Sequence, residues 1–188
     1  VLHKQNGETV NLHDYHLMNF DSENSLIAPA VKVPKGSYTF IEFSIGFNQS
    51  DNAGYHQGLS SDWTWPSGYG DGYYFMKLDV SAERPYSGYS SYYSNSNSYY
   101  DFSFYYGAAS INSQAQENHV RYKLPNVKIT GNKSAVEIKM DISEWFKSPT
   151  IWDFDKYDNY DIFEYEAQKE IQAQAESVFS LGSVLNKN

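Results

Sequence analysis

Two tryptophans stand one residue apart in a turn-forming stretch of this 188-residue chain. Trp63 and Trp65 are followed at once by Pro66 and Gly68, before the sequence returns to an aromatic run at Tyr73. Turns usually lie at the surface, so a large aromatic group in one either covers the end of a core or forms the wall of a binding site. Because both tryptophans have the same parity in an extended segment, either interpretation fits the pair.

Histidine and carboxylate are the candidate metal ligands, because the chain has five histidines and no cysteine. Disulfides, thiolate zinc sites and cysteine nucleophiles are therefore excluded. His13 and His16 do not alternate onto one face of a strand, so we interpret them as surface or turn histidines. The acidic stretch 153–161 lacks EF-hand spacing, because Tyr157 and Asp158 occupy its fifth and sixth positions. Calcium binding by its carboxylates and carbonyls stays open as an alternative.

Catalytic motifs are missing from the sequence, and we predict that the protein is not an enzyme. There is no Gly-x-Ser-x-Gly elbow, no His-Glu-x-x-His and no glycine-rich phosphate loop. Carboxylate pairs such as Asp62 and Asp71 arise by chance in an acidic chain. The net charge of −9 disfavours nucleic acid as a partner. No apolar run approaches the ~20 residues of a transmembrane helix, so no transmembrane segment is expected.

Alternation of apolar and polar residues is the strongest periodic signal and predicts β-strands. One alternating segment, 119–124, places His119 on a polar face with Arg121 and Lys123. The five apolar faces are Ile41, Phe43 and Ile45; Tyr74, Met76, Leu78 and Val80; Phe102, Phe104 and Tyr106; Val120, Tyr122 and Leu124; and Val136, Ile138, Met140 and Ile142.

Turn-forming residues separate these segments at 34–36 and 130–133, and no helical pattern interrupts them. The expected fold is therefore mainly β, an antiparallel β-sandwich. One C-terminal amphipathic helix is predicted over 164–178, because Ala167, Ile171, Ala175 and Val178 recur at helical spacing. Residues 179–184 are expected to return as a closing strand. We predict one domain over residues 1–188.

A stretch at about 81–100 is rich in Tyr, Ser and Asn and low in charge, and it predicts a long loop. Its composition is typical of paratopes, in which tyrosine supplies rigid amphipathic area and small polar residues adapt. Such a loop would suit a glycan, a peptide or a protein of the cell envelope. A mobile insertion without a ligand fits the composition equally.

Segments 33–38 (Val-Pro-Lys-Gly-Ser-Tyr), 63–69 (Trp-Thr-Trp-Pro-Ser-Gly-Tyr) and 75–79 (Phe-Met-Lys-Leu-Asp) follow one another, with 104–107 (Phe-Tyr-Tyr-Gly) and 145–149 further along. Together they resemble the MbnP-like family of exported proteins, named for the periplasmic partner in methanobactin gene cassettes. The resemblance covers most of the chain from about residue 31 onward. Its most specific piece is the Trp-x-Trp-x-x-Gly-Tyr segment.

The resemblance implies a β-sandwich that binds a copper ion through two histidines and a tryptophan oxidised to kynurenine. On this chain it implies His56 as one imidazole ligand and Trp63 as the tryptophan. Copper-binding members carry their second histidine where this sequence reads Tyr-Tyr-Gly at 105–107, so His119 is the candidate for the second imidazole. The residues predicted to bind a ligand are Trp65, Tyr69, Tyr105 and Tyr106.

These inferences predict an exported, non-enzymatic copper-binding protein of the bacterial cell envelope, with a role in metal acquisition or storage. We expect it in the periplasm or at the cell surface. The chain begins at Val1 without a methionine, which is compatible with a removed export signal. The alternative prediction is a metal-free envelope module that recognises a glycan, a peptide or a protein through its Tyr-rich loop.

Overall fold

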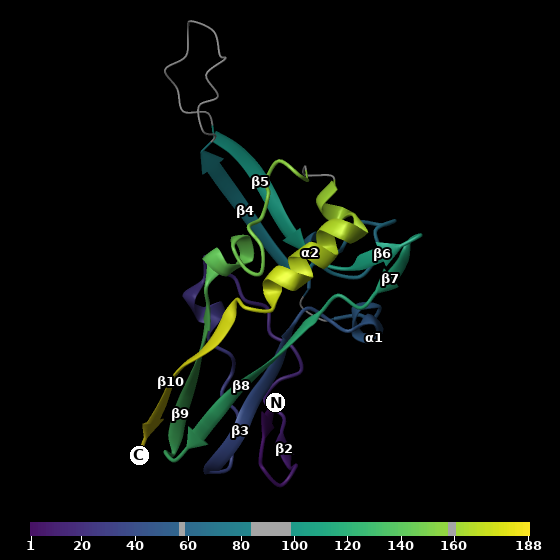
Figure 1. Cartoon of the computed structure of the whole chain (residues 1–188). Helices are drawn as coiled ribbons and strands as arrows, with labels where there is room; N and C mark the ends of the chain where they lie inside the picture. Colours follow the sequence, from purple (N-terminus) through teal and green to yellow (C-terminus); the bar gives the residue numbers. More distant parts are fainter. Residues whose placement is uncertain (57–58, 84–98, 158–160) are drawn as a thin grey trace, which may run out of the picture. The chain divides into compact units, whose positions relative to one another are not determined.

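The computed structural model describes residues 1–56, 59–83, 99–157 and 161–188. The chain forms two compact units, each built from segments that are separate in sequence (Figure 1). Unit 1 comprises residues 1–44, 121–141 and 178–188, and unit 2 comprises residues 45–120 and 142–177. The single domain expected over residues 1–188 stays a prediction.

Unit 1 is built from two layers of strands (Figure 1). One is a four-stranded sheet with the order β2, β1, β3, β8, and the other is the antiparallel pair of β9 and β10. The elements of this part of the chain are β1 (Leu2–His3), β2 (Thr9–Val10), the 3-10 helix η1 (Glu23–Leu26), β3 (Gly36–Ile45), β8 (Val120–Ile129), β9 (Lys133–Met140) and β10 (Phe179–Lys187).

The core of unit 1 lies between these two layers. Leu2 on β1 pairs with Ile41 on β3, and both side chains are buried together with Val127 on β8. Val136 on β9 and Leu181 on β10 pack against the same cluster from the second layer. Antiparallel strands in two layers around one apolar core confirm the predicted β-sandwich class.

The predicted alternation holds along β8 and weakens along β9. Val120, Tyr122 and Leu124 are buried, as expected for a strand with one face in a core. On β9, by contrast, Ile138 is exposed. The expected strand through Ile142 is wrong, because pairing with β10 ends at Met140 and Ile142 opens a 3-10 helix.

Unit 2 combines two hairpin-like strand pairs with the one long helix of the described chain. β4 and β5 pair antiparallel, and β6 and β7 form a hairpin whose turn residues Asn112 and Ser113 both have positive φ. The elements are α1 (Gln49–Asn52), η2 (Ser61–Trp63), β4 (Met76–Glu83), β5 (Tyr99–Tyr106), β6 (Ala109–Ile111), β7 (Gln114–Gln116), η3 (Ile142–Phe146), η4 (Asp161–Phe163) and α2 (Tyr165–Ala175).

The C-terminal helix α2 buries the predicted stripe. Ala167, Ile171 and Ala175 are all inaccessible to solvent, which confirms the helical spacing. The helix ends at Ala175, so Val178 lies beyond it, where its carbonyl accepts a hydrogen bond from the N–H of Asp141. No helix in the described ranges is long and apolar enough to cross a membrane.

Two expected boundaries in unit 2 differ from the structure. Tyr74 precedes β4, because its N–H donates to the carbonyl of Trp63 across the turn and not to a neighbouring strand. The Tyr-rich loop expected at about 81–100 is strand at both ends, since Glu83 pairs with Tyr99. The remainder, 84–98, lies outside the described residues, so recognition through it stays a prediction.

Candidate functional site

All seven residues predicted to bind a metal or a ligand belong to unit 2, whereas His3, His13 and His16 belong to unit 1. The Nε2 atoms of His13 and His16 contact the backbone carbonyls of Pro29 and Ser25 in unit 1. The seven predicted residues are His56, Trp63, Trp65, Tyr69, Tyr105, Tyr106 and His119.

The two tryptophans of the turn have different environments. Trp65 is only 1% exposed, and its indole N–H donates to the carbonyl of Tyr69 over 2.9 Å. Gly107 lies against its ring, so that a Cβ at position 107 would approach Trp65 Cε3 to 2.2 Å. Trp65 is therefore a core residue. Trp63 is half-buried and stands at the end of η2.

Trp63 belongs to an aromatic cluster, here defined as Trp63, Tyr74 and Tyr105, around the ammonium group of Lys77. Lys77 Nζ lies 4.5 Å from the ring centre of Tyr74, 5.7 Å from that of Trp63 and 5.8 Å from that of Tyr105. It also donates to the carbonyl of Asp62 over 2.6 Å. Cation–π attraction and this hydrogen bond hold the half-buried indole in place.

Tyr105 and Tyr106, which stand where copper-binding family members carry a histidine, differ in burial as the two tryptophans do. Tyr106 is fully buried, and its hydroxyl donates to the carbonyl of Asn118. Tyr105 is half-buried and donates to Asp79 over 3.1 Å, with its ring edge-on to Tyr74. Burial raises the pKa of Tyr74, and the neighbouring Tyr105 adds to the shift. The raised pKa favours the neutral phenol of Tyr74.

His56 is half-buried and held on three sides. Its ring stacks on Phe47 with centres 4.3 Å apart and meets the ring of Tyr73 edge-on at 5.3 Å. Its Nε2 lies 2.7 Å from the carbonyl oxygen of Asp51 in α1. A carbonyl only accepts hydrogen bonds, so Nε2 carries the proton and Nδ1 the lone pair of the neutral ring.

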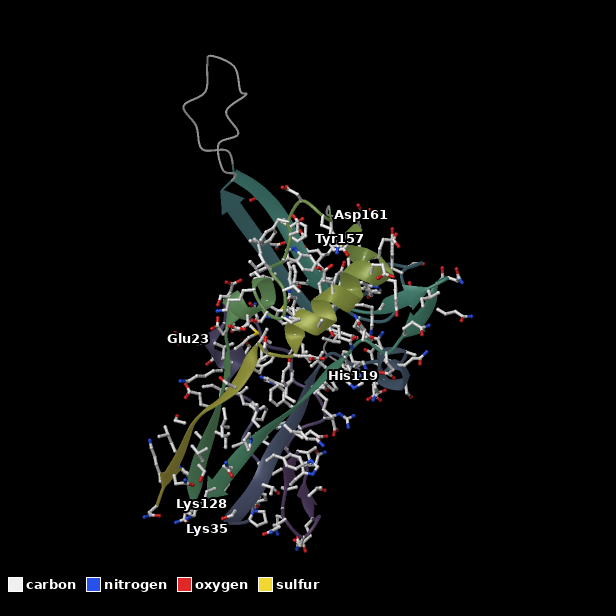
Figure 2. All side chains as sticks on the ribbon, in the orientation of Figure 1. Glu23, Lys35, His119, Lys128, Tyr157 and Asp161 are labelled. Atoms are coloured by element: carbon white, nitrogen blue, oxygen red, sulfur yellow. The ribbon has the colours of Figure 1, made fainter. Side chains whose placement is uncertain are left out.

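His119 lies directly before β8, at the position labelled in Figure 2. Its Nδ1 is 2.8 Å from Oε2 of Glu117, and its side chain is 17% exposed. Arg121 and Lys123, with which it was expected to share a polar face, are more than half exposed. His119 precedes the strand, which begins at Val120, so the shared polar face stays a prediction for this residue.

A buried polar network supports this end of unit 2. Gln168 of α2 accepts from the N–H of Gly107 over 2.9 Å and donates to the carbonyls of Tyr105 and Ile162. Asn118 donates to the carbonyl of Gly107 over 2.8 Å. Buried amides with satisfied partners fix the backbone around them, so β5 and the segment before β8 have defined positions.

The family model of MbnP matches residues 1–168 of the chain. The chain belongs to the MbnP family. The match includes all seven predicted site residues. No curated protein and no solved structure matches the chain. The MbnP family is metal-associated and is associated with extracellular proteins.

The imidazole nitrogens of His56 and His119 fit copper in their chemistry. Imidazole nitrogen suits copper, and metal-binding histidines usually give their other ring nitrogen to a carboxylate or a backbone carbonyl. His119 has a carboxylate partner and His56 a carbonyl partner, so both meet this requirement. In the described parts of the chain, no three His, Asp or Glu side chains gather as a metal site.

The acidic stretch 153–161 is the alternative metal site predicted from the sequence. Asp155 donates its N–H to the carboxylate of Asp153 over 2.9 Å, and Tyr157 donates to Glu170 of α2. Tyr157 and Asp161 are labelled in Figure 2 near the start of α2. Residues 158–160 lie outside the described residues, so calcium binding there stays a prediction.

Sequence reasoning missed Glu117 and Lys77, which hold two of the predicted residues. A Glu two positions before a His was a visible signal for the first. Nothing local indicated the second, because Lys77 reaches the aromatic cluster across the turn that separates it from Asp62.

Proposed function

We propose that this protein is an exported copper-binding protein of the bacterial cell envelope, with no catalytic activity of its own. His56 and His119 would supply imidazole nitrogens. Trp63 would supply the third group after conversion to kynurenine, in which an external oxidant opens the indole ring and the formyl carbon is released. The unmodified indole N–H is a donor and offers no lone pair to a metal. Metal acquisition or storage is the role that such a protein would serve.

The observation that carries the proposal is the hydrogen-bond partner that each of the two imidazoles has. Each of the two predicted histidines has one ring nitrogen fixed by an acceptor, and both belong to unit 2. An oriented ring loses less freedom when it binds a metal, which is why such partners raise metal affinity. The half-buried Trp63 belongs to the same unit and is the one tryptophan of the chain that is not buried.

Calorimetric titration with copper tests the proposal. The wild type should bind one equivalent, and His56→Ala or His119→Ala should each weaken binding by at least the ~10–100-fold that loss of a supporting partner costs. His13→Ala and His16→Ala are matched controls, because these histidines also bond backbone carbonyls but belong to unit 1. Absence of binding, or binding that both site variants leave unchanged, would overturn the proposal.

Intact mass and peptide mapping test the role of Trp63 separately. Protein isolated from its native host should carry the kynurenine mass shift on the peptide that contains Trp63. The buried Trp65 on the same peptide is the internal control, and fragmentation distinguishes the two positions. Unmodified Trp63 in copper-loaded protein would remove it from the ligand set while leaving the histidines in place.

A further inference from the structure

Glu117 joins two parts of unit 2 through its two carboxylate oxygens. Its Oε2 lies 2.8 Å from Nδ1 of His119, and its Oε1 accepts from the backbone N–H of Gln49 over 3.0 Å. Gln49 is the first residue of α1. One carboxylate therefore holds the histidine and the beginning of this short helix together.

The other end of the same helix holds His56. The carbonyl of Asp51 in α1 is the partner of His56 Nε2 at 2.7 Å. The helix itself is fixed, because Asn48 caps it by accepting from the N–H of Asp51 and Gln49 donates to the carbonyl of Ala115. An unbroken path of hydrogen bonds and one helical turn thus connects the two predicted ligands.

Side chains of α2 fix the main chain on both sides of this carboxylate. Lys169 Nζ donates to the carbonyl of Glu117 over 3.0 Å, and Gln172 Nε2 donates to the carbonyl of His119 over 3.2 Å. Burial lowers the pKa of Lys169, and the negative charge of Glu117 opposes that shift. The segment from Glu117 to His119 is therefore held by its backbone as well as by its side chains.

We propose that Glu117 is the positioning residue of the metal site and that it couples the two histidines through α1. A carboxylate only accepts, so it keeps the proton of the neutral His119 ring on Nδ1 and presents the Nε2 lone pair. The exposed charge pair adds little stability by itself. Its effect is on tautomer and orientation. This inference rests on the proposed copper site.

Nitrogen NMR of the histidine rings tests the tautomer in metal-free protein. Wild-type His119 should show the Nδ1–H form at a pH where the ring is neutral. Glu117→Gln should shift the population toward Nε2–H, the form that predominates in a free ring. Glu176→Gln is the control for loss of one exposed acidic charge near the end of α2. An unchanged His119 tautomer in Glu117→Gln would overturn the positioning role.

Copper affinity tests the consequence. Glu117→Gln should weaken binding by about 10–100-fold, and Glu117→Asp should recover part of the loss. If the wild type binds copper and Glu117→Gln binds equally well, the positioning role fails and the copper proposal stands. If the wild type binds no copper, both fail. Far-ultraviolet circular dichroism and a thermal melt establish that the variant is folded.

Gln49→Pro tests the coupling through α1. Proline is tolerated at the first position of a helix, so this change removes the N–H that Glu117 accepts and keeps the turn. Gln49→Ala is the matched control, because it loses the same side chain and keeps the N–H. We expect Gln49→Pro to lower copper affinity about tenfold relative to Gln49→Ala. Equal affinities would overturn the coupling.

Discussion

Unit 1 and unit 2 are stabilised in different ways. The core of unit 1 is mostly aliphatic, built from strand residues such as Leu2, Ile41 and Val127. Unit 2 packs rings against rings, as Phe104 does edge-on with Trp145 and Trp152, and it buries the amides of Asn118 and Gln168. Aliphatic packing is non-directional, whereas buried amides and ring edges require defined geometry.

The difference explains why the candidate site belongs to unit 2. A metal site needs side chains whose orientation is fixed, and the polar network of unit 2 fixes backbone and rings together. Two of the histidines of unit 1, His13 and His16, contact backbone carbonyls in exposed segments. Unit 1 contains the two-layered sandwich, and unit 2 contains the residues of the proposed site.

Replacing Trp65 should have the largest effect. Trp65→Ala removes a fully buried ring from unit 2 and should lower the free energy of unfolding by about 3–5 kcal/mol. Trp63→Ala, one residue away and half-buried, should cost well under half of that. Urea unfolding followed by circular dichroism measures both. Equal losses would contradict the separate roles assigned to the two tryptophans.

Ile41→Ala tests whether the core of unit 1 affects the proposed site in unit 2. It empties part of the aliphatic core of unit 1 and should cost about 2–5 kcal/mol. Copper affinity, measured below the unfolding transition, should stay within a factor of two or three of the wild-type value. A loss of affinity as large as that of His119→Ala would show that the site depends on the core of unit 1, contrary to the comparison.

Lys77→Gln should loosen Trp63 without unfolding the chain. Loss of cation–π contacts at an exposed ammonium is expected to cost about 0.5–1 kcal/mol. The other three tryptophans are buried, so acrylamide quenching of fluorescence reports mainly on Trp63. Quenching should increase in Lys77→Gln and stay nearly normal in Lys77→Arg. Identical quenching in all three proteins would exclude Lys77 as a clamp on Trp63.

Glu137 provides a smaller, pH-dependent test in unit 1. The backbone N–H of Ser183 and then its hydroxyl donate to the carboxylate, and they hold the pKa of Glu137 below its ordinary 4.5. A lowered folded-state pKa stabilises the fold above pH 4.5, and this contribution is lost as the pH falls through the folded-state value. The stability difference between wild type and Glu137→Gln should therefore shrink below pH 4.5. A difference that is constant with pH would contradict this.

The strands were predictable where one face meets a core. Burial along Val120, Tyr122 and Leu124 follows from the sequence pattern, because alternation is a local property of an extended chain. In the sequence, Ile142 continues the alternating pattern of β9. In the structure it opens a 3-10 helix, because a strand ends where pairing with its partner strand ends. That information lies in β10, far along the sequence.

The candidate site was predictable in its residue types and not in its supports. Parity could not distinguish Trp63 from Trp65, since the distinction depends on the approach of Gly107. Glu117 stands two residues from His119, but its second partner is the N–H of Gln49, 68 residues away. Tertiary contacts of this kind have no local signature.

A crystal grown with copper and measured at the copper absorption edge tests the central claim most directly. The account predicts one anomalous peak in unit 2, within bonding distance of a ring nitrogen of His56 and of Nε2 of His119. A copper peak only at His13 or His16 would contradict the account. So would the absence of any peak in a crystal of protein that binds stoichiometric copper in solution.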